Sequence, residues 1–171
     1  MKYLKIDNQL FIENRRKFMD KLRKNTLAIF NSNDIMPTNA DGTMPFKQNS
    51  DLFYLCGIDQ EETILIIIKK SSEFKSLLFI RETNENIKIW EGTKLSKNQA
   101  KYTSKVDVVY WNTEFKHTLD AIMSQNKTVF LNTNEHPRAT ITVETRDARF
   151  SKWIREKFPA HKYKKAATIM Y

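Results

Sequence analysis

The sequence predicts an α/β domain built on a mixed sheet of about six strands, with helices on the faces of the sheet. Two observations lead to this prediction. The aliphatic run Ile64–Ile68 is too continuous for a strand with one wet face, so it indicates a central strand covered on both sides. The second half of the chain alternates strand-like and helix-like segments, which favours parallel pairing there.

The first half is expected to hold one helix followed by several strands. Phe11, Phe18 and Leu22 mark one face of a helix over residues 9–24, with charged residues on the other face. Short polar connections between the later apolar segments suggest an antiparallel meander. The expected strands are Thr26–Phe30, Leu52–Cys56, Ile64–Ile68, Ser76–Ile80 and Ile87–Trp90.

The second half is expected to continue with a weak helix over residues 96–104 and a strand at Val106–Tyr110. Thr113 can cap the next helix, which precedes a strand at Thr128–Leu131. A turn is expected at His136, Pro137 and Arg138. The apolar faces of the last two helices are expected to carry, respectively, Phe115, Leu119, Ile122 and Met123, and Val143, Phe150, Trp153, Ile154 and Phe158.

Size and composition indicate one ordinary globular domain. The chain has 171 residues, of which 40% are hydrophobic, and a domain of this length needs neither disulfides nor metal to fold. The lone Cys56 cannot form an internal disulfide. The first residues show no secretory signal, and no run approaches the roughly 18 apolar residues of a membrane span. We therefore expect a cytoplasmic protein.

The net charge of +9 raises the question of a nucleic-acid partner. The basic residues concentrate in two segments, 15–24 and 146–165, which both resemble the solvated faces of amphipathic helices. Most aromatic residues fall at core-facing positions, whereas base stacking needs them interleaved with basic residues on strands. A basic module that binds nucleic acid or protein without peptidase activity stays open as an alternative function.

Motifs that carry chemistry are missing from the sequence. It has no glycine-rich phosphate loop, which counts against nucleotide chemistry, and neither HExxH nor a pair of cysteines for zinc. His117, His136 and His161 stand far apart. His117 and Asp120 could share a helix face, but two ligands make a weak metal site. We therefore expect neither catalytic residues nor a metal in this chain.

One polar stretch carries a resemblance to a known family. The loop 31–49 runs into Gln48–Gly57, which reads QNSDLFYLCG, and Ile89–Gly92 reads IWEG. Together with Phe11 and the pair Arg15 and Arg16, these segments resemble the N-terminal domain of Xaa-Pro aminopeptidases (aminopeptidase P). The resemblance implies the creatinase/prolidase N-terminal domain type, which is ribonuclease H-like. The family usually has Glu-Pro soon after the glycine, where this chain reads DQEE, so we expect a looser turn.

The resemblance implies a parent enzyme that removes an N-terminal residue when proline follows it. In the family, the chemistry belongs to a C-terminal pita-bread domain that binds two metal ions, usually manganese. Residues 1–171 would then form the N-terminal domain alone, without that catalytic domain and inactive by itself. The implied partners are the catalytic domain, neighbouring subunits of a homo-oligomer and a peptide with proline at its second position, with no membrane or nucleic acid.

Two residues match family positions with a role at the active site of a neighbouring subunit. Trp90 corresponds to a tryptophan that reaches across to the substrate pocket, and Asp41 to an aspartate in a hydrogen-bond network there. The alternatives are core packing for Trp90 and a turn cap for Asp41. The run Asn49, Ser50 and Asp51 is interpreted mainly as a structural feature that binds the backbone of its own loop.

Overall fold

A six-stranded mixed sheet forms the middle layer of the protein, with strand order β4-β3-β2-β1-β5-β6. The structure is a computed structural model; it describes residues 4, 6–71, 73–133 and 143–170, and only the backbone of Trp90. The strands are β1 Thr26–Asn31, β2 Ile64–Lys70, β3 Glu73–Ile80, β4 Val108–Trp111, β5 Thr128–Leu131 and β6 Lys162–Lys165. This architecture confirms the predicted mixed sheet flanked by helices.

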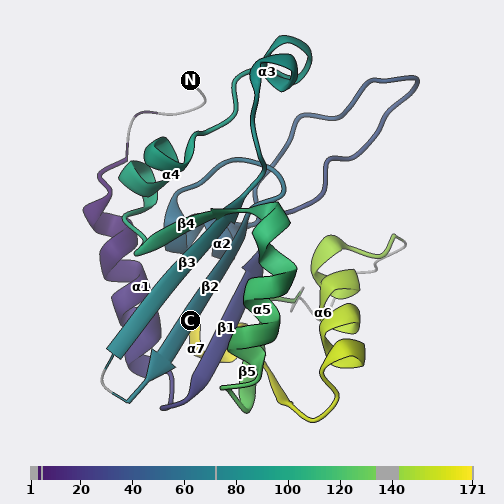
Figure 1. The fold of residues 1–171 in the computed structure, drawn as a ribbon. Helices are drawn as coiled ribbons and strands as arrows, with labels where there is room; N and C mark the ends of the chain where they lie inside the picture. The colour runs from purple at the N-terminus through teal and green to yellow at the C-terminus, as the bar shows by residue number, and fades with distance from the viewer. Residues whose placement is uncertain (1–3, 5, 72, 134–142, 171) are drawn as a thin grey trace.

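The helices cover both faces of the sheet (Figure 1). One face carries α1, α2, α4 and α7, and the other carries α5 and α6. The helices are α1 Gln9–Lys21, α2 Ser50–Cys56, α3 Glu85–Glu91, α4 Lys97–Ser104, the short 3-10 helix η1 Asn112–Glu114, α5 Phe115–Met123, α6 Arg146–Lys157 and α7 Ala167–Met170.

Strand directions agree with the division expected between the two halves. β2 pairs antiparallel with both β1 and β3, whereas β5 pairs parallel with β1 and β6, and β4 pairs parallel with β3. β2 is central and covered on both sides, as predicted: Leu65 and Ile67 enter one core cluster, while Ile64, Ile66 and Ile68 enter the other.

Two segments predicted as strands are helices. Leu52–Cys56 belongs to α2, because the side chain of Asn49 accepts hydrogen bonds from the backbone N–H groups of Asp51 and Leu52 and starts a helical turn. Ile87–Trp90 belongs to α3, where Asn84 caps the helix by accepting from the N–H of Ile87 at 2.9 Å. The expected meander is therefore shorter and comprises β1, β2 and β3.

Smaller differences lie in the second half. Thr113 is not a helix cap: it lies within η1, and its hydroxyl donates to Glu82. Val143 precedes α6 and is exposed, so it does not belong to the apolar face of that helix. β6 was not predicted, because its lysine-rich sequence has no apolar run. The turn expected at His136, Pro137 and Arg138 lies outside the described residues.

Candidate functional site at one edge of the sheet

Several loops meet at the edge of the sheet where β1, β3 and β4 end and β2 begins. β1 and β3 both run antiparallel to β2, and β4 runs parallel to β3, so these ends face the same way. The loop 32–49 leaves from β1, and α3 follows β3. Figure 1 shows both projecting beyond the same end of the sheet. We call this end the loop edge.

Asp41 lies at an exposed turn in the projecting loop. The turn closes through backbone groups, since the N–H of Gly42 donates to Asn39 O at 3.0 Å and the N–H of Thr38 donates to Gly42 O at 2.9 Å. An isolated bridge between Pro37 and Thr43 continues this narrow hairpin. The backbone thus shapes the turn and leaves Asp41 facing solvent.

Trp90 occupies the last turn of α3, one residue before the helix ends at Glu91. Its indole lies outside what the structure describes, so core packing is neither supported nor opposed by a contact. None of the other residues of α3 is buried, and Ile89 is 71% exposed. The structure therefore places Trp90 and Asp41 on two separate projections of the loop edge.

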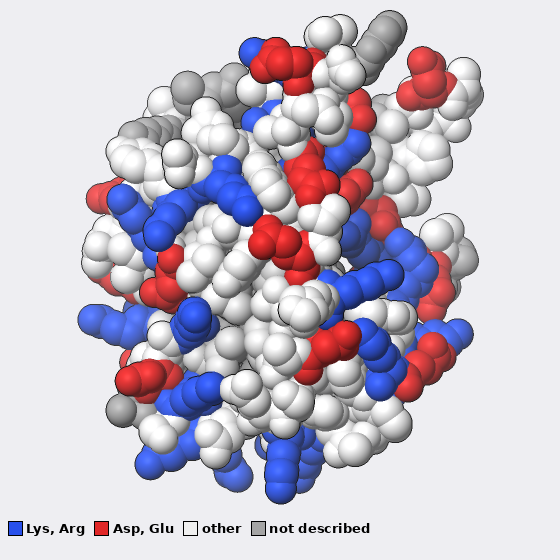
Figure 2. Space-filling view, viewed as in Figure 1, with Lys and Arg blue, Asp and Glu red and all other residues white. Residues whose placement is uncertain are grey.

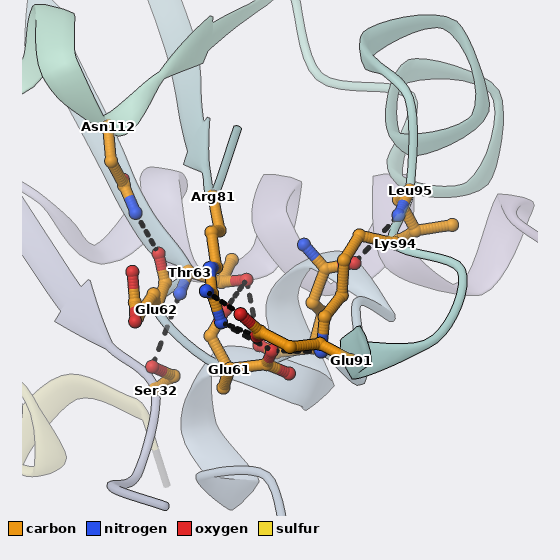
Figure 3. A network of polar contacts seen from close by, with 10 residues as sticks. Ser32, Glu61, Glu62, Thr63, Arg81, Glu91, Lys94, Leu95 and Asn112 are labelled. Atoms are coloured by element: carbon orange, nitrogen blue, oxygen red, sulfur yellow. Dashed lines mark hydrogen bonds and ion pairs between the residues drawn. The ribbon is translucent and has the colours of Figure 1, made fainter. Parts of the chain in front are cut away.

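A cluster of charged groups lies at the base of these projections (Figure 3). The guanidinium of Arg81 holds both carboxylate oxygens of Glu91, at 2.5 and 2.7 Å. The same Arg81 lies 3.6 Å from Glu61, which also binds the ammonium group of Lys94. Glu61 is buried although it carries a charge, and it is satisfied by two cations.

The surroundings shift the pKa values of this cluster. Burial alone would raise the pKa of Glu61, but the hydrogen bond and charge of Lys94, together with the charge of Arg81, outweigh it and lower the pKa. Burial would lower the pKa of Arg81, and its contacts with Glu91, Glu62 and Glu61 raise it instead. Both groups are therefore held in their charged forms.

The turn before β2 is well bonded without the proline that the family usually has there. The side-chain amide of Gln48 donates to the carbonyls of Ile58 and Gln60 at 3.0 and 2.9 Å. The hydroxyl of Thr63 donates to Gln60 O at 2.8 Å. Glu62 adopts a φ of 53°, which proline cannot adopt. The looser turn expected from the sequence is replaced by a network of side-chain hydrogen bonds.

Within the run Asn49, Ser50 and Asp51, the side chain of Asn49 has the structural role that the sequence predicts. Asn49 caps α2, and Gly57 ends it in the left-handed conformation with a φ of 68°. Together with the hydrogen bonds of Gln48, these contacts show that the first two residues of the QNSD stretch start a helix and fix a turn. No substrate contact is needed to account for Gln48 and Asn49.

Sequence reasoning missed the four residues of the charged cluster. A usable signal was present, because Glu61 lies just before an apolar strand and Arg81 lies just after its antiparallel neighbour. Opposite charges in those two places must meet at one sheet edge. Glu91 and Lys94 have no comparable signal, since they lie on either side of Gly92 outside the sheet.

The described residues offer no site for the implied metal ions. Among residues 4, 6–71, 73–133 and 143–170, no group of three or more His, Cys, Asp or Glu is close enough to hold a metal. His117 and Asp120 do not form a site, because Asp120 is paired with Lys157 at 2.6 Å. The manganese pair implied by the resemblance does not fit the residues present in this part of the chain.

Positive charge is mixed with negative charge on the face seen in Figure 2. Some basic residues are neutralised in ion pairs, such as Arg149 with Asp34 at 2.7 Å and Lys97 with Glu114 at 3.1 Å. No described helix is long and apolar enough to cross a membrane. These surface features do not favour the alternative of a basic nucleic-acid module.

The fold and its loop edge define a three-layer α/β domain with exposed projections at the edge where β1, β3 and β4 end. The chain belongs to the family of aminopeptidase P N-terminal domains, whose model matches residues 11–131. This membership confirms the resemblance drawn from the QNSD and IWEG stretches.

Relatives of known name agree with the family. The chain is 24% identical over 156 residues to an Xaa-Pro aminopeptidase of Escherichia coli, which covers 91% of this chain and 35% of the relative. It is 26% identical over 119 residues to an Xaa-Pro aminopeptidase of Haemophilus influenzae, covering 70% of this chain and 28% of the relative. The chain thus spans about a third of the length of these relatives.

Solved structures share the fold. A Bacillus anthracis protein assigned as an aminopeptidase P superposes with a TM-score of 0.86 at 22% identity, covering 96% of this chain and 39% of that one. Aminopeptidase P of Escherichia coli superposes with a TM-score of 0.73 at 24% identity, covering 92% and 36% respectively. At such identities the likeness establishes the architecture of the domain.

Proposed function

We propose that this chain is the non-catalytic N-terminal domain of a longer, metal-dependent Xaa-Pro aminopeptidase. The parent enzyme would remove an N-terminal residue that precedes proline. The observation that carries the proposal is the family match over residues 11–131, combined with relatives of which the match covers only 35% and 28%. Residues 1–171 would form one domain, and the catalytic domain with its two manganese ions would be a separate part of the protein, in the cytoplasm.

The role proposed for the domain is to build a homo-oligomer and to close the active site of a neighbouring subunit. Asp41 and Trp90 would be the residues that it contributes. Their location supports this role, because the backbones of both lie on projections of the loop edge, and the side chain of Asp41 is exposed. An indole provides a rigid apolar wall for a prolyl ring, and a carboxylate can orient a cation or a backbone amine.

Peptidase assays test the proposal directly. The 171-residue chain alone should not hydrolyse an Xaa-Pro peptide with added Mn²⁺, whereas the longer protein should. In the longer protein, Trp90→Ala should lower kcat/KM by about 10- to 100-fold, as expected when one substrate-contacting aromatic is lost. Hydrolysis by the chain alone would overturn the non-catalytic role, and an unchanged kcat/KM in Trp90→Ala would remove Trp90 from the site.

A further inference from the structure

Helix α3 has no fully buried side chain among those that the structure describes. It has seven residues. Figure 1 shows it at the far end of the molecule, beyond the edge of the sheet. Isolated helices shorter than about 12 residues are marginal in water. The helix that carries Trp90 therefore depends on contacts at its two ends.

The first end of α3 is fixed by a cap and, just before it, by the hydrogen bond that Thr113 donates to Glu82. The side chain of Asn84 accepts a hydrogen bond from the N–H of Ile87, and both residues belong to the local segment. A local cap starts the helix but does not tie it to the sheet. These contacts lie at the start of the helix, so the orientation of the end next to Trp90 depends on further contacts there.

That other end is bound by ion pairs. Glu91 directly follows Trp90, and both its oxygens contact the guanidinium of Arg81, which extends from the end of β3. A two-point contact between planar groups fixes direction as well as distance. The arginine is in turn next to Glu61, from the turn before β2. Figure 3 shows these groups converging on one another.

The segment that leaves α3 is tied to the same turn. Lys94 binds Glu61, and the backbone N–H of Leu95 donates to the side-chain oxygen of Gln60 at 2.8 Å. Between these contacts, Gly92 has a φ of 81°, and nothing lies within 4 Å of the position its Cβ would take. The backbone is thus open at Gly92 and held on both sides of it by side chains.

We propose that Arg81 and Glu91, supported by Glu61 and Lys94, are positioning residues that fix how α3 presents Trp90 to the neighbouring active site. We call these four residues the α3 clamp. This inference rests on the proposed function of Trp90. Without the clamp, the short exposed helix α3 would sample many orientations. Substrate binding would then carry the entropy cost of fixing the helix in one of them.

Hydrogen exchange tests whether the clamp holds α3. In Glu91→Gln, the amides of α3 should exchange about tenfold faster or more, while those of β2 keep their protection, since only local opening is affected. The matched control is Glu85→Gln on the same helix, where the carboxylate is 87% exposed and lies 3.8 Å from Lys88. Equal exchange in the two variants would overturn the clamp. Arg81→Lys, which keeps the charge but loses the two-point contact, should resemble Glu91→Gln.

A double-mutant cycle in the longer protein tests whether the clamp acts through Trp90. Glu91→Gln should lower kcat/KM for an Xaa-Pro peptide about 3- to 30-fold alone, and should have no further effect in the Trp90→Ala background. Additive losses would contradict action through Trp90. If Trp90→Ala itself leaves kcat/KM unchanged, the proposed function of Trp90 fails, and with it the clamp's role in catalysis, whereas exchange rates still report separately on whether α3 is held.

Discussion

Arg15 is buried within the domain and holds two helices by their last carbonyls. It is 3% exposed, and its guanidinium donates to Leu55 O at 2.8 Å and to Lys105 O at 2.9 Å. These carbonyls lie at the ends of α2 and α4, where the helix dipole favours a cation. Burial lowers the pKa of Arg15, and electrostatic interactions with Cys56, in its thiolate form, and with Asp107 partly oppose this effect.

Replacement of Arg15 should therefore be costly. We expect Arg15→Met to lower the free energy of unfolding by about 2–4 kcal/mol, because two carbonyls lose their charged donor. Arg16→Met is the matched control, since Arg16 is exposed on the same helix, and it should stay within about 0.5 kcal/mol. Urea unfolding measures both. Equal losses would show that the buried hydrogen bonds contribute little.

Cys56 gives a second prediction at the scale of a single residue. Burial raises the pKa of its thiol to about 12, against smaller opposing effects of a backbone hydrogen bond and Arg15. Because the thiolate is the nucleophile, a disulfide reagent at pH 8 should react with the native chain at least about 100-fold more slowly than with the urea-unfolded chain. Fast labelling of the native chain would contradict the burial of Cys56.

Two segments that we predicted as strands are helices because a single residue caps each of them. All five residues of Ile64–Ile68 are apolar, as expected for a strand that is covered on both faces. β2 could therefore be predicted from these residues alone. Leu52–Cys56 and Ile87–Trp90 look equally strand-like, but Asn49 and Asn84 each offer a side-chain oxygen to the following N–H groups and start a helix. Short apolar runs do not reveal which structure their neighbours impose.

The packing contact between α1 and α2 depends on Gly57. A Cβ there would lie 2.2 Å from a ring carbon of Phe11, at a φ of 68° that disfavours other residues. We expect Gly57→Ala to cost about 2 kcal/mol or more in the free energy of unfolding. The double variant Phe11→Leu/Gly57→Ala should lose less than the sum of the single variants, because the smaller side chain makes room. A strictly additive loss would contradict the close approach.

The free energy of unfolding should depend on pH through Glu61, which lies in the turn before β2. The lowered pKa of Glu61 means that its contribution is present above its ordinary value of 4.5 and is lost as the pH falls through the folded value. At pH 7, Glu61→Gln should lower the free energy of unfolding by about 1–3 kcal/mol, because the part-buried Lys94 and Arg81 lose a counterion. The carboxylates of Glu91 and Glu62 remain near these two cations in the variant. Urea unfolding near pH 3 should show a smaller difference between variant and wild type. A difference that does not shrink would contradict the ion pairing.

At the scale of the whole molecule, the sequence located the loop edge but not the way it is held. The positions of Asp41 and Trp90 came from family motifs, and the structure places both on exposed projections. The sequence offered a signal for Glu61 and Arg81 but none for Lys94, which is 33 positions from Glu61 and meets it only because β2 pairs with β3. Long-range pairs of this kind depend on topology, which local patterns do not specify.

Subunit mixing in the longer protein tests the central claim that this domain completes the active site of a neighbour. One subunit would carry Trp90→Ala, and the other would carry a disabled catalytic domain with an intact N-terminal domain. Each alone should hydrolyse an Xaa-Pro peptide poorly, and mixed oligomers should recover activity, because an intact domain then meets an intact catalytic site. Mixed oligomers no more active than the average of the two parents would contradict the claim.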